Sequence, residues 1–221
     1  MKSVLISIRP KWCEMIASGE KTIEVRKTRP KLEPPFRCYI YCTQPRKAHQ
    51  VICGSHILSN DELYDELYRH PQDGIKYGDG IALMLCDDYT ESSFLNGKII
   101  GEFTCDRIDK IIQSDEPYDI YDIGDDYVRQ TCLENGALWD YGRGAALHGW
   151  HISDLKIYDK PKRVSEFWYP PEKYCEKELC GGCPGDQVAD VNGEYSYDCE
   201  WRRPLSRPPQ SWCYVEGSDA K

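Results

Sequence analysis

The first 26 residues alternate between apolar runs and charged stretches in an order that predicts a strand, a helix, a turn and a second strand. Residues 1–8 (MKSVLISI) form a short apolar run with β-branched side chains, which is typical of a strand. Pro10 opens a predicted helix over residues 10–18, because proline is tolerated in the first helical turn. Gly19 follows this helix and is expected to end it, since glycine adopts the left-handed backbone found there without strain.

The stretch after this turn brings three charged side chains close together. Residues 22–26 alternate between polar and apolar positions, so a strand here would direct Glu24 and Arg26 to one face and the apolar residues to a core. Lys21 enters the same face from the turn. A lysine, a carboxylate and an arginine at the mouth of one strand suit recognition of an anion or a nucleobase edge, or acid–base chemistry. The alternative is a solvated strand face whose charges pair with one another, which is common and stabilises a protein little.

Farther along the chain, apolar and β-branched runs bounded by turn residues predict more strands. They lie at residues 36–43, 51–58, 81–86, 98–108, 150–158 and 211–215. Short helices are expected at residues 61–70 and 127–135, a hairpin turn at Asn96-Gly97, and a further turn at residues 142–144. Many short strands with few helices favour an α+β fold, a mixed β-barrel with peripheral helices.

The motif G-x-K-x-x-E-x-R, formed by Gly19, Lys21, Glu24 and Arg26, overlaps the end of the stretch VLISIRPKWCEMIASGEK. With this motif after a predicted strand, helix and glycine turn, the chain resembles the ASCH domain, a small β-barrel of the PUA-like superfamily. Three later segments also look like members of this family, particularly small proteins of bacteria and phages; they are GKIIGEFTCDRI, LHGWHISDLKIYDKPKRVSEF and RPPQSWCYVE. The resemblance covers most of the chain, with a gap in a cysteine-rich part, and implies a PUA-like barrel that binds RNA or a nucleotide.

The resemblance also implies where the ligand binds. In the ASCH fold the lysine and the arginine of the motif face a cleft in the barrel, so Lys21, Glu24 and Arg26 would line that cleft here. Three further candidates for the same ligand site are Arg9, Trp150 and Trp212. A tryptophan can stack on a base, although a tryptophan on a strand packs more often in the core. The predicted partner is RNA, a nucleotide or a nucleoside.

A second hypothesis makes the protein an enzyme. Some ASCH proteins that look like this one are amidohydrolases that remove the acetyl group of N4-acetylcytidine with a lysine and a threonine of one strand and a glutamate of a later strand. Lys21 matches the lysine, but Glu24 stands at the threonine position, and Glu102 is the candidate for the later acid. These three are the catalytic candidates of a hydrolase, and a Lys-Glu-Arg set would also suit RNA cleavage. The binding hypothesis is favoured over the enzyme hypothesis because Glu24 replaces the family's threonine at the catalytic position itself.

Charge is unevenly distributed along the 221 residues. The net charge is −9, yet residues 1–50 hold 11 basic and 4 acidic side chains, against 17 and 33 in the rest. A basic N-terminal part on an acidic body can present a local positive surface, whereas a general nucleic-acid coat is disfavoured. No apolar run approaches the ~20 residues of a membrane helix and no secretion signal is present, so a cytoplasmic protein without membrane contact is expected.

The cysteine pattern changes near the end of the chain, which has 12 cysteines in all. The spacing C-x4-C-x2-C-x15-C is formed by Cys175, Cys180, Cys183 and Cys199. A C-x2-C knuckle with further cysteines is typical of a structural zinc site, and Cys213 is a rival fourth ligand. An iron–sulfur cluster and a loop of reduced thiols are the alternatives. Zinc is therefore the predicted cofactor.

This change of composition divides the chain into three parts. Residues 1–168 are predicted to form the barrel, residues 169–203 a cysteine-rich insertion, and residues 204–221 the final barrel strand and a tail. A third functional hypothesis is a protein-interaction adaptor, in which the insertion and the tyrosines in and after the acidic segment contact another protein. These tyrosines are Tyr118, Tyr121, Tyr127 and Tyr141.

Overall fold

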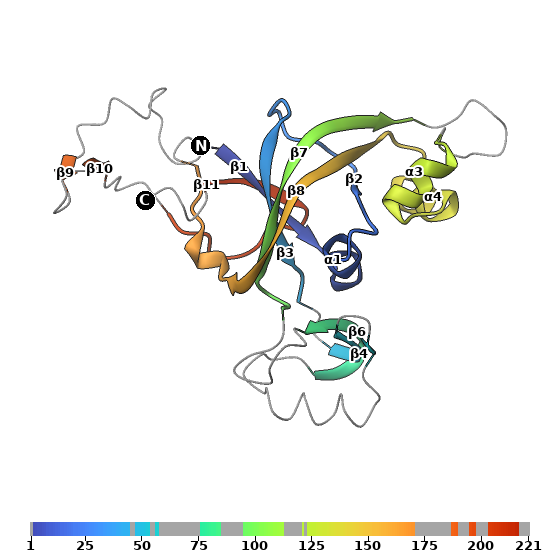
Figure 1. Cartoon of the computed structure of the whole chain (residues 1–221), viewed down its shortest axis with the longest axis horizontal. Helices are drawn as coiled ribbons and strands as arrows, with labels where there is room; N and C mark the ends of the chain where they lie inside the picture. Colours follow the sequence, from blue (N-terminus) through green and yellow to red (C-terminus); the bar gives the residue numbers. More distant parts are fainter. Residues whose placement is uncertain are drawn as a thin grey trace.

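The central sheet combines strands from both ends of the chain. The computed structural model describes residues 2–44, 47–53, 56–57, 76–84, 95–112, 121, 123–170, 187–189, 195–197 and 203–216. Within them, six strands form one sheet in the order β11–β1–β3–β7–β8–β2 (Figure 1). The strands are β1 (Lys2–Ile8), β2 (Ile23–Arg26), β3 (Phe36–Cys42), β7 (Ile99–Ile111), β8 (Leu147–Lys162) and β11 (Trp212–Glu216).

The helices and two smaller sheets complete the described part of the chain. The helices are α1 (Pro10–Ala17), α3 (Asp125–Thr131), α4 (Asn135–Gly142) and a single 3-10 turn, Val164–Glu166. The strands β4 (Lys47–Cys53), β5 (His56–Ile57) and β6 (Lys76–Met84) form a separate three-stranded sheet, and β9 (Gln187–Ala189) pairs with β10 (Tyr195–Tyr197). Figure 1 shows α3 and α4 together at one end of β7 and β8. No helix among the described residues is long and apolar enough to cross a membrane.

The six-stranded sheet is mixed and open. β1 runs parallel to β3 and antiparallel to β11, and the other neighbouring strands are antiparallel. No strand pairing among the described residues joins β2 to β1 or β11, so the α+β class is confirmed but the closed barrel is not formed. Instead, the Arg26 guanidinium reaches from β2 to β1 and donates a hydrogen bond to the Ser7 carbonyl, with 2.6 Å between Nη2 and O. A side chain therefore bridges the gap that a barrel would close with a backbone ladder.

Alternation along β1 supplies two cores on opposite faces of the sheet. Val4, Ile6 and Ile8 enter a core that also holds Trp150 and the buried face of α1, whereas Leu5 enters a second core on the other face. Successive side chains of a strand point to opposite faces, so a run that is apolar throughout can be buried on both sides. The continuous apolar run at the start of the chain thus marks a central strand.

Two predicted elements differ from the observed ones because local backbone turns override the pattern. Residues 127–135 do not form one helix: α3 ends at Thr131, Cys132 adopts a left-handed backbone with φ 54°, and α4 begins at Asn135. Gly97 does adopt the positive φ of a turn, 80°. The described strands before and after this turn, β6 and β7, are not neighbours in a sheet, since β6 pairs with β4 while β7 pairs with β3 and β8. The predicted helix at residues 61–70 lies outside the described residues.

Candidate functional site

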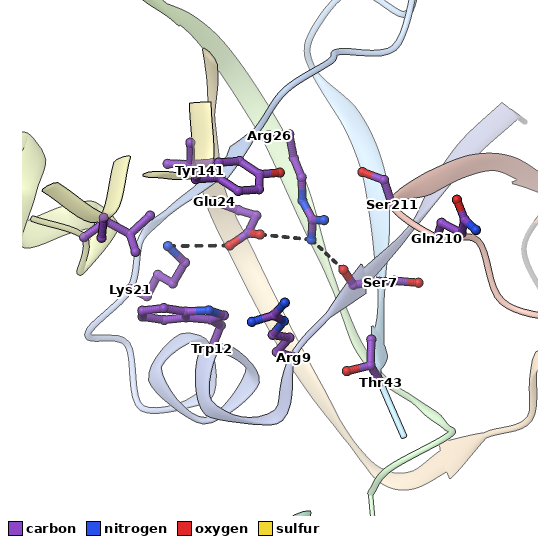
Figure 2. A pocket seen from close by; sticks show the side chains of 13 residues that line it. Ser7, Arg9, Trp12, Lys21, Glu24, Arg26, Thr43, Tyr141, Gln210 and Ser211 are labelled. Atoms are coloured by element: carbon purple, nitrogen blue, oxygen red, sulfur yellow. Dashed lines mark hydrogen bonds and ion pairs between the residues drawn. The ribbon is translucent and has the colours of Figure 1, made fainter. Parts of the chain in front are cut away.

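A cavity of about 490 Å³ lies beside the gap between β2 and β1. Its wall is formed by β2, the ends of β1 and β3, the first turn of α1, one face of α4, and the residues just before β11 (Figure 2). This volume falls in the range of about 300–1,000 Å³ that is typical of small-molecule sites. Three basic side chains and one acidic side chain line the cavity, and they are Arg9, Lys21, Arg26 and Glu24.

The charged residues of the motif form a buried triad at this cavity. Glu24 lies between two cations: its Oε2 is 3.5 Å from Lys21 Nζ and its Oε1 is 2.9 Å from Arg26 Nη2. The three residues are only 2%, 6% and 8% exposed for Lys21, Glu24 and Arg26. The interpretation of this strand face as a solvated one is therefore wrong. Buried charges persist only when they are paired and hydrogen-bonded, so the surrounding fold must supply partners that hold this triad in place.

Hydrogen bonds to the backbone hold the two cations of the triad in place. Lys21 Nζ donates to the Thr131 carbonyl at 2.5 Å, at the C-terminal end of α3, where a helix favours a positive charge. Arg26 Nη2 donates to the Ser7 carbonyl, as described above. The Gly19 turn, with φ 81°, sets up this arrangement, because it lets the Lys21 amide return to the Met15 carbonyl at the end of α1.

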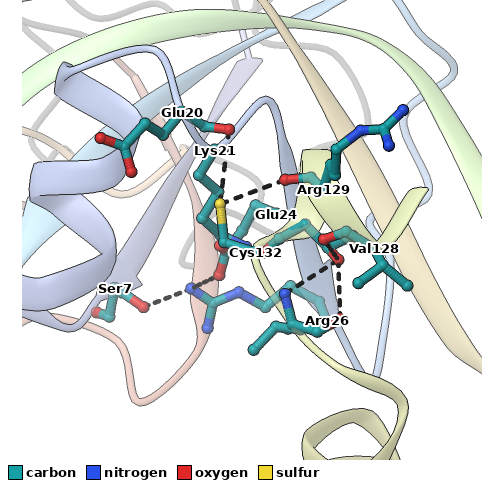
Figure 3. A network of polar contacts seen from close by, with 10 residues as sticks. Ser7, Glu20, Lys21, Glu24, Arg26, Val128, Arg129 and Cys132 are labelled. Carbon is teal, nitrogen blue, oxygen red and sulfur yellow. Dashed lines mark hydrogen bonds and ion pairs between the residues drawn. The ribbon is translucent and has the colours of Figure 1, made fainter. Parts of the chain in front are cut away.

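Burial gives Lys21 an acid–base character that an exposed lysine lacks. Desolvation lowers the pKa of Lys21 below its ordinary value, and the neighbouring Glu24 carboxylate opposes that change. A lysine with a lowered pKa gives up its proton more readily and can act as a general base. The nearby Cys132 thiol has its pKa raised, first by burial, and donates weak hydrogen bonds to backbone carbonyls (Figure 3).

Two aromatic side chains form opposite walls of the cavity. Trp12 projects from α1, with its ring centroid 5.2 Å from Lys21 Nζ. Tyr141 projects from α4, and Lys27 Nζ lies 5.0 Å from its ring centroid. Figure 2 shows the two rings on either side of the contact between Lys21 and Glu24. A planar group that enters between the rings would meet aromatic surface on both sides and charged groups at its edge.

The structure brings four of the predicted ligand residues together. Lys21, Glu24 and Arg26 line the cavity with Arg9, which follows the last residue of β1 and precedes the first residue of α1. The Arg9 side chain is exposed, and its guanidinium makes no hydrogen bond or ion pair to another residue that the structure describes.

The other three predicted site residues lie outside the cavity wall, where they pack or bond to other parts of the sheet. Trp150 is fully buried in the core, edge-on to Phe36, and does not reach the cavity. Trp212 packs against the same core, and its Nε1 donates to the Thr28 hydroxyl. Glu102 accepts a hydrogen bond from the Tyr158 hydroxyl at 2.7 Å and lies outside the cavity wall, so it does not complete a catalytic set with Lys21.

Sequence reasoning missed several residues of the wall, above all Trp12. The four-residue spacing of Ala137 and Tyr141 carries a signal, because residues four apart lie on one face of a helix, here α4. The sequence pattern instead groups Tyr141 with other tyrosines as a protein-contact face. Tyr121 is buried and donates to the Ala145 carbonyl, so it cannot belong to such a face, and Tyr118 lies outside the described residues.

The cysteines of the predicted zinc module lie outside the described residues, namely Cys175, Cys180, Cys183 and Cys199. The rival ligand Cys213 lies on β11 opposite Leu5 of β1, and its side chain packs against the second core. Within the part of the chain that the structure describes, no group of three or more His, Cys, Asp or Glu side chains is arranged to hold a metal ion.

The chain was also compared with known proteins. No family model and no curated protein sequence matches it. The crystal structure of ASCH from Zymomonas mobilis matches with a TM-score of 0.46 and 14% identity, covering 97% of this chain and 87% of that one. A mutant form of the Zymomonas mobilis protein matches with a TM-score of 0.45 and 14% identity, covering 99% and 94%. These structures bear the name of the family that the motif resembles, and at this level of likeness they assign no ligand and no activity.

Proposed function

We propose that the cavity beside β2 binds a nucleotide unit, either free or as part of single-stranded RNA. The observation that carries the proposal is the buried triad of Lys21, Glu24 and Arg26 at a cavity walled by Trp12 and Tyr141. These side chains supply the two things that a nucleotide requires of a protein, a surface for a flat aromatic ring and donors for atoms that accept hydrogen bonds.

Charge supports an anionic ligand. Three cations and one carboxylate give the cavity lining a formal charge of +2, whereas the whole chain carries −9. A positive cavity on an acidic protein attracts anions locally and repels long stretches of polyanion elsewhere. The proposal is therefore confined to one or a few nucleotides and excludes a broad duplex interface.

The aromatic walls support a planar group in the ligand. Stacking of a base on an aromatic side chain contributes roughly 1–3 kcal/mol, and it tolerates any base because every base has a π face. Lys21 and Arg26 would then donate hydrogen bonds to acceptor atoms at the edge of the base or to phosphate. Glu24 orients both cations, since each of its carboxylate oxygens pairs with one of them.

Fluorescence titration of the intact chain with ribonucleosides, ribonucleotides and short single-stranded RNAs tests the proposal. We expect quenching on binding, and a loss of affinity of about 10-fold or more when Trp12 is changed to leucine, from the stacking energy above. The control is Trp139→Leu, since this half-buried tryptophan lies on the same helix as Tyr141 but outside the cavity wall. Equal losses in the two variants, or no binding of any of these compounds by the unaltered protein, would contradict the proposal.

A hydrolase acting on an acylated nucleoside is the second candidate, and the lowered pKa of Lys21 favours it. The cavity holds Lys21 beside Glu24, and hydroxyl groups of Thr43 and Ser211 line the same space. In this reaction a nucleophilic oxygen attacks the acyl carbon, Lys21 accepts the proton, and the amine leaves with a proton returned to it. Glu24 stands at the position of the family's threonine, so a different nucleophile is needed. Either water attacks directly, or one of the other hydroxyls attacks and water then hydrolyses the acyl-enzyme to release acetate.

Incubation with N4-acetylcytidine and detection of acetate by proton NMR tests this candidate. If Lys21 is the base, acetate and cytidine form in equal amounts, and Lys21→Met abolishes the reaction in a protein that remains folded by circular dichroism. Absence of acetate at high enzyme concentration would leave binding as the function.

We also propose that the cysteine-rich segment holds one structural zinc ion. Its support is the spacing of Cys175, Cys180, Cys183 and Cys199, which offers four thiolates to a metal that prefers tetrahedral coordination. Metal analysis of protein produced with ample zinc should find about one zinc per chain, and replacing Cys180 and Cys183 by serine should remove it. A metal-free protein would favour reduced thiols.

A further inference from the structure

The cavity has two chemically different ends, and this division points to a more specific ligand. Figure 2 shows Lys21, Trp12 and Tyr141 toward one end and Ser7, Thr43, Gln210 and Ser211 toward the other, with Arg9 and Arg26 between them. The first end combines aromatic surface with a paired charge. The second end is made of hydroxyl and amide groups.

Several polar groups around the second end have no partner within the described residues. The side chains of Arg9, Thr43, Gln210 and Ser211 all line the cavity, and none of them makes a hydrogen bond to another described residue. Surface polar groups commonly face water, but here four of them converge on one space together with an arginine of the triad. Such convergence of donors is what an oxyanion requires.

Arg26 adds a buried donor to the same region. Its Nη2 is committed to Glu24 and to the Ser7 carbonyl, while its Nε is buried and has no hydrogen-bond partner among the described residues. The guanidinium also lines the cavity, and its two other contacts hold it in place before a ligand enters. A guanidinium oriented in this way is suited to binding an anion.

Charge balance distinguishes the two ends. Each carboxylate oxygen of Glu24 pairs with one of the two triad cations, whereas no described acidic side chain forms an ion pair with Arg9. The cavity cation without a described carboxylate partner is therefore Arg9, which Figure 2 shows between the aromatic end and the hydroxyl groups. A base stacked between Trp12 and Tyr141 would be uncharged, so the excess positive charge is available for another part of the ligand.

We propose that Arg9 and Arg26, with the hydroxyl and amide groups of the second end, form a phosphate subsite, and that the cavity accepts a nucleoside monophosphate unit with its base at the aromatic end. This inference rests on the proposed nucleotide-binding function and assigns the phosphate a place of its own. The phosphate belongs either to a free mononucleotide or to the terminal nucleotide of an RNA chain, since both present the same chemistry.

The experiment is a comparison of Kd values by isothermal titration calorimetry for the four ribonucleosides and their 5′- and 3′-monophosphates. We expect the better monophosphate of at least one base to bind about 10- to 100-fold more tightly than its nucleoside, the range that charge-assisted hydrogen bonds supply. In Arg9→Gln this ratio should fall toward one, and Arg9→Lys should restore part of it. The matched control is Arg207→Gln, which removes the same charge from an exposed arginine outside the cavity wall.

The outcomes separate this inference from the function on which it rests. If nucleosides bind as tightly as monophosphates, or if Arg9→Gln weakens both equally, the phosphate subsite is refuted while base binding stands. If no nucleoside, nucleotide or RNA binds, the proposed function fails as well. Where the ratio behaves as expected, a trinucleotide that binds more tightly than the mononucleotide assigns the phosphate to an RNA end, and equal binding assigns it to a free nucleotide.

Discussion

Changing Glu24 to glutamine tests whether the triad is organised by its central charge. The substitution preserves the size of the side chain and removes the negative charge that lies 3.5 Å from Lys21 Nζ and 2.9 Å from Arg26 Nη2. Removing one partner of a buried ion pair typically costs about 3–5 kcal/mol of folding free energy, because a buried charge is left uncompensated. The substitution breaks two ion pairs, but both cations keep their hydrogen bonds to backbone carbonyls. We therefore expect a total loss of about 3–5 kcal/mol, well below the sum for two separate ion pairs.

Urea unfolding followed by tryptophan fluorescence measures this loss, with Glu20→Gln as the control. Glu20 is exposed and lies next to Lys21 in the chain, so its substitution should change the free energy of unfolding by less than about 0.5 kcal/mol. A loss of the expected size is a large share of the roughly 5–15 kcal/mol that stabilises a typical domain. Unfolding should therefore begin at much lower urea concentrations in the Glu24 variant.

The pH dependence of this loss gives an independent check. Burial lowers the pKa of folded Lys21 and Glu24 raises it, so the variant should have a still lower pKa at Lys21. Between that pKa and the value of about 10.4 in the unfolded chain, the unfolded state binds more protons, and stability rises with pH. The deficit of the variant should then narrow as the pH rises through the lowered pKa of Lys21. A deficit under about 0.5 kcal/mol at pH 7, or one that widens with pH, would refute the reasoning.

Three further predictions concern the scaffold around the cavity. A Cβ at Gly149 would overlap the Tyr127 hydroxyl, so Gly149→Ala should cost about 1–3 kcal/mol in a urea melt, whereas Gly136→Ala, which has open space on α4, should cost nothing. Trp150→Phe should reduce the free energy of unfolding by roughly 1–3 kcal/mol through lost core packing, and so lower the melting temperature, yet leave nucleotide affinity unchanged; a lost affinity would return Trp150 to the binding site. Burial raises the pKa of the Cys105 thiol to about 12, so mass spectrometry should find it unlabelled by thiol reagents at pH 8 until urea unfolds the protein, and rapid labelling of the folded chain would disprove its burial.

The charged part of the site could be predicted because it depends only on residues that lie close together in the sequence. Pro10 and Gly19 mark the ends of α1, and alternation over four residues of β2 directs Glu24 and Arg26 to one side. Lys21 joins them because it follows the Gly19 turn and precedes β2 by only two residues. These statements need only the period of a strand and the preferences of proline and glycine, and the structure agrees with each of them. The ligand of the site stays a prediction.

The walls of the cavity could not be read in the same way. Ser211 reaches the site because its carbonyl accepts a hydrogen bond from the Ser7 amide at 2.8 Å, a contact between residues near opposite ends of the chain. Tyr141 arrives on a helix that begins only after the left-handed turn at Cys132. Glu102, placed near Lys21 by family analogy, instead bonds Tyr158 away from the cavity. Partners so distant in sequence are selected by which faces bury together, and that depends on the whole sheet.

The faces and the ends of the first elements follow from short-range backbone geometry, which can be read from the sequence, and so does the convergence of Lys21, Glu24 and Arg26. The burial of the triad, the open sheet with Arg26 bridging to Ser7, and the position of Trp12 opposite Tyr141 across a cavity are visible only in the folded chain. Burial and cavities arise from long-range packing, where each surface is covered by whatever the rest of the fold brings to it.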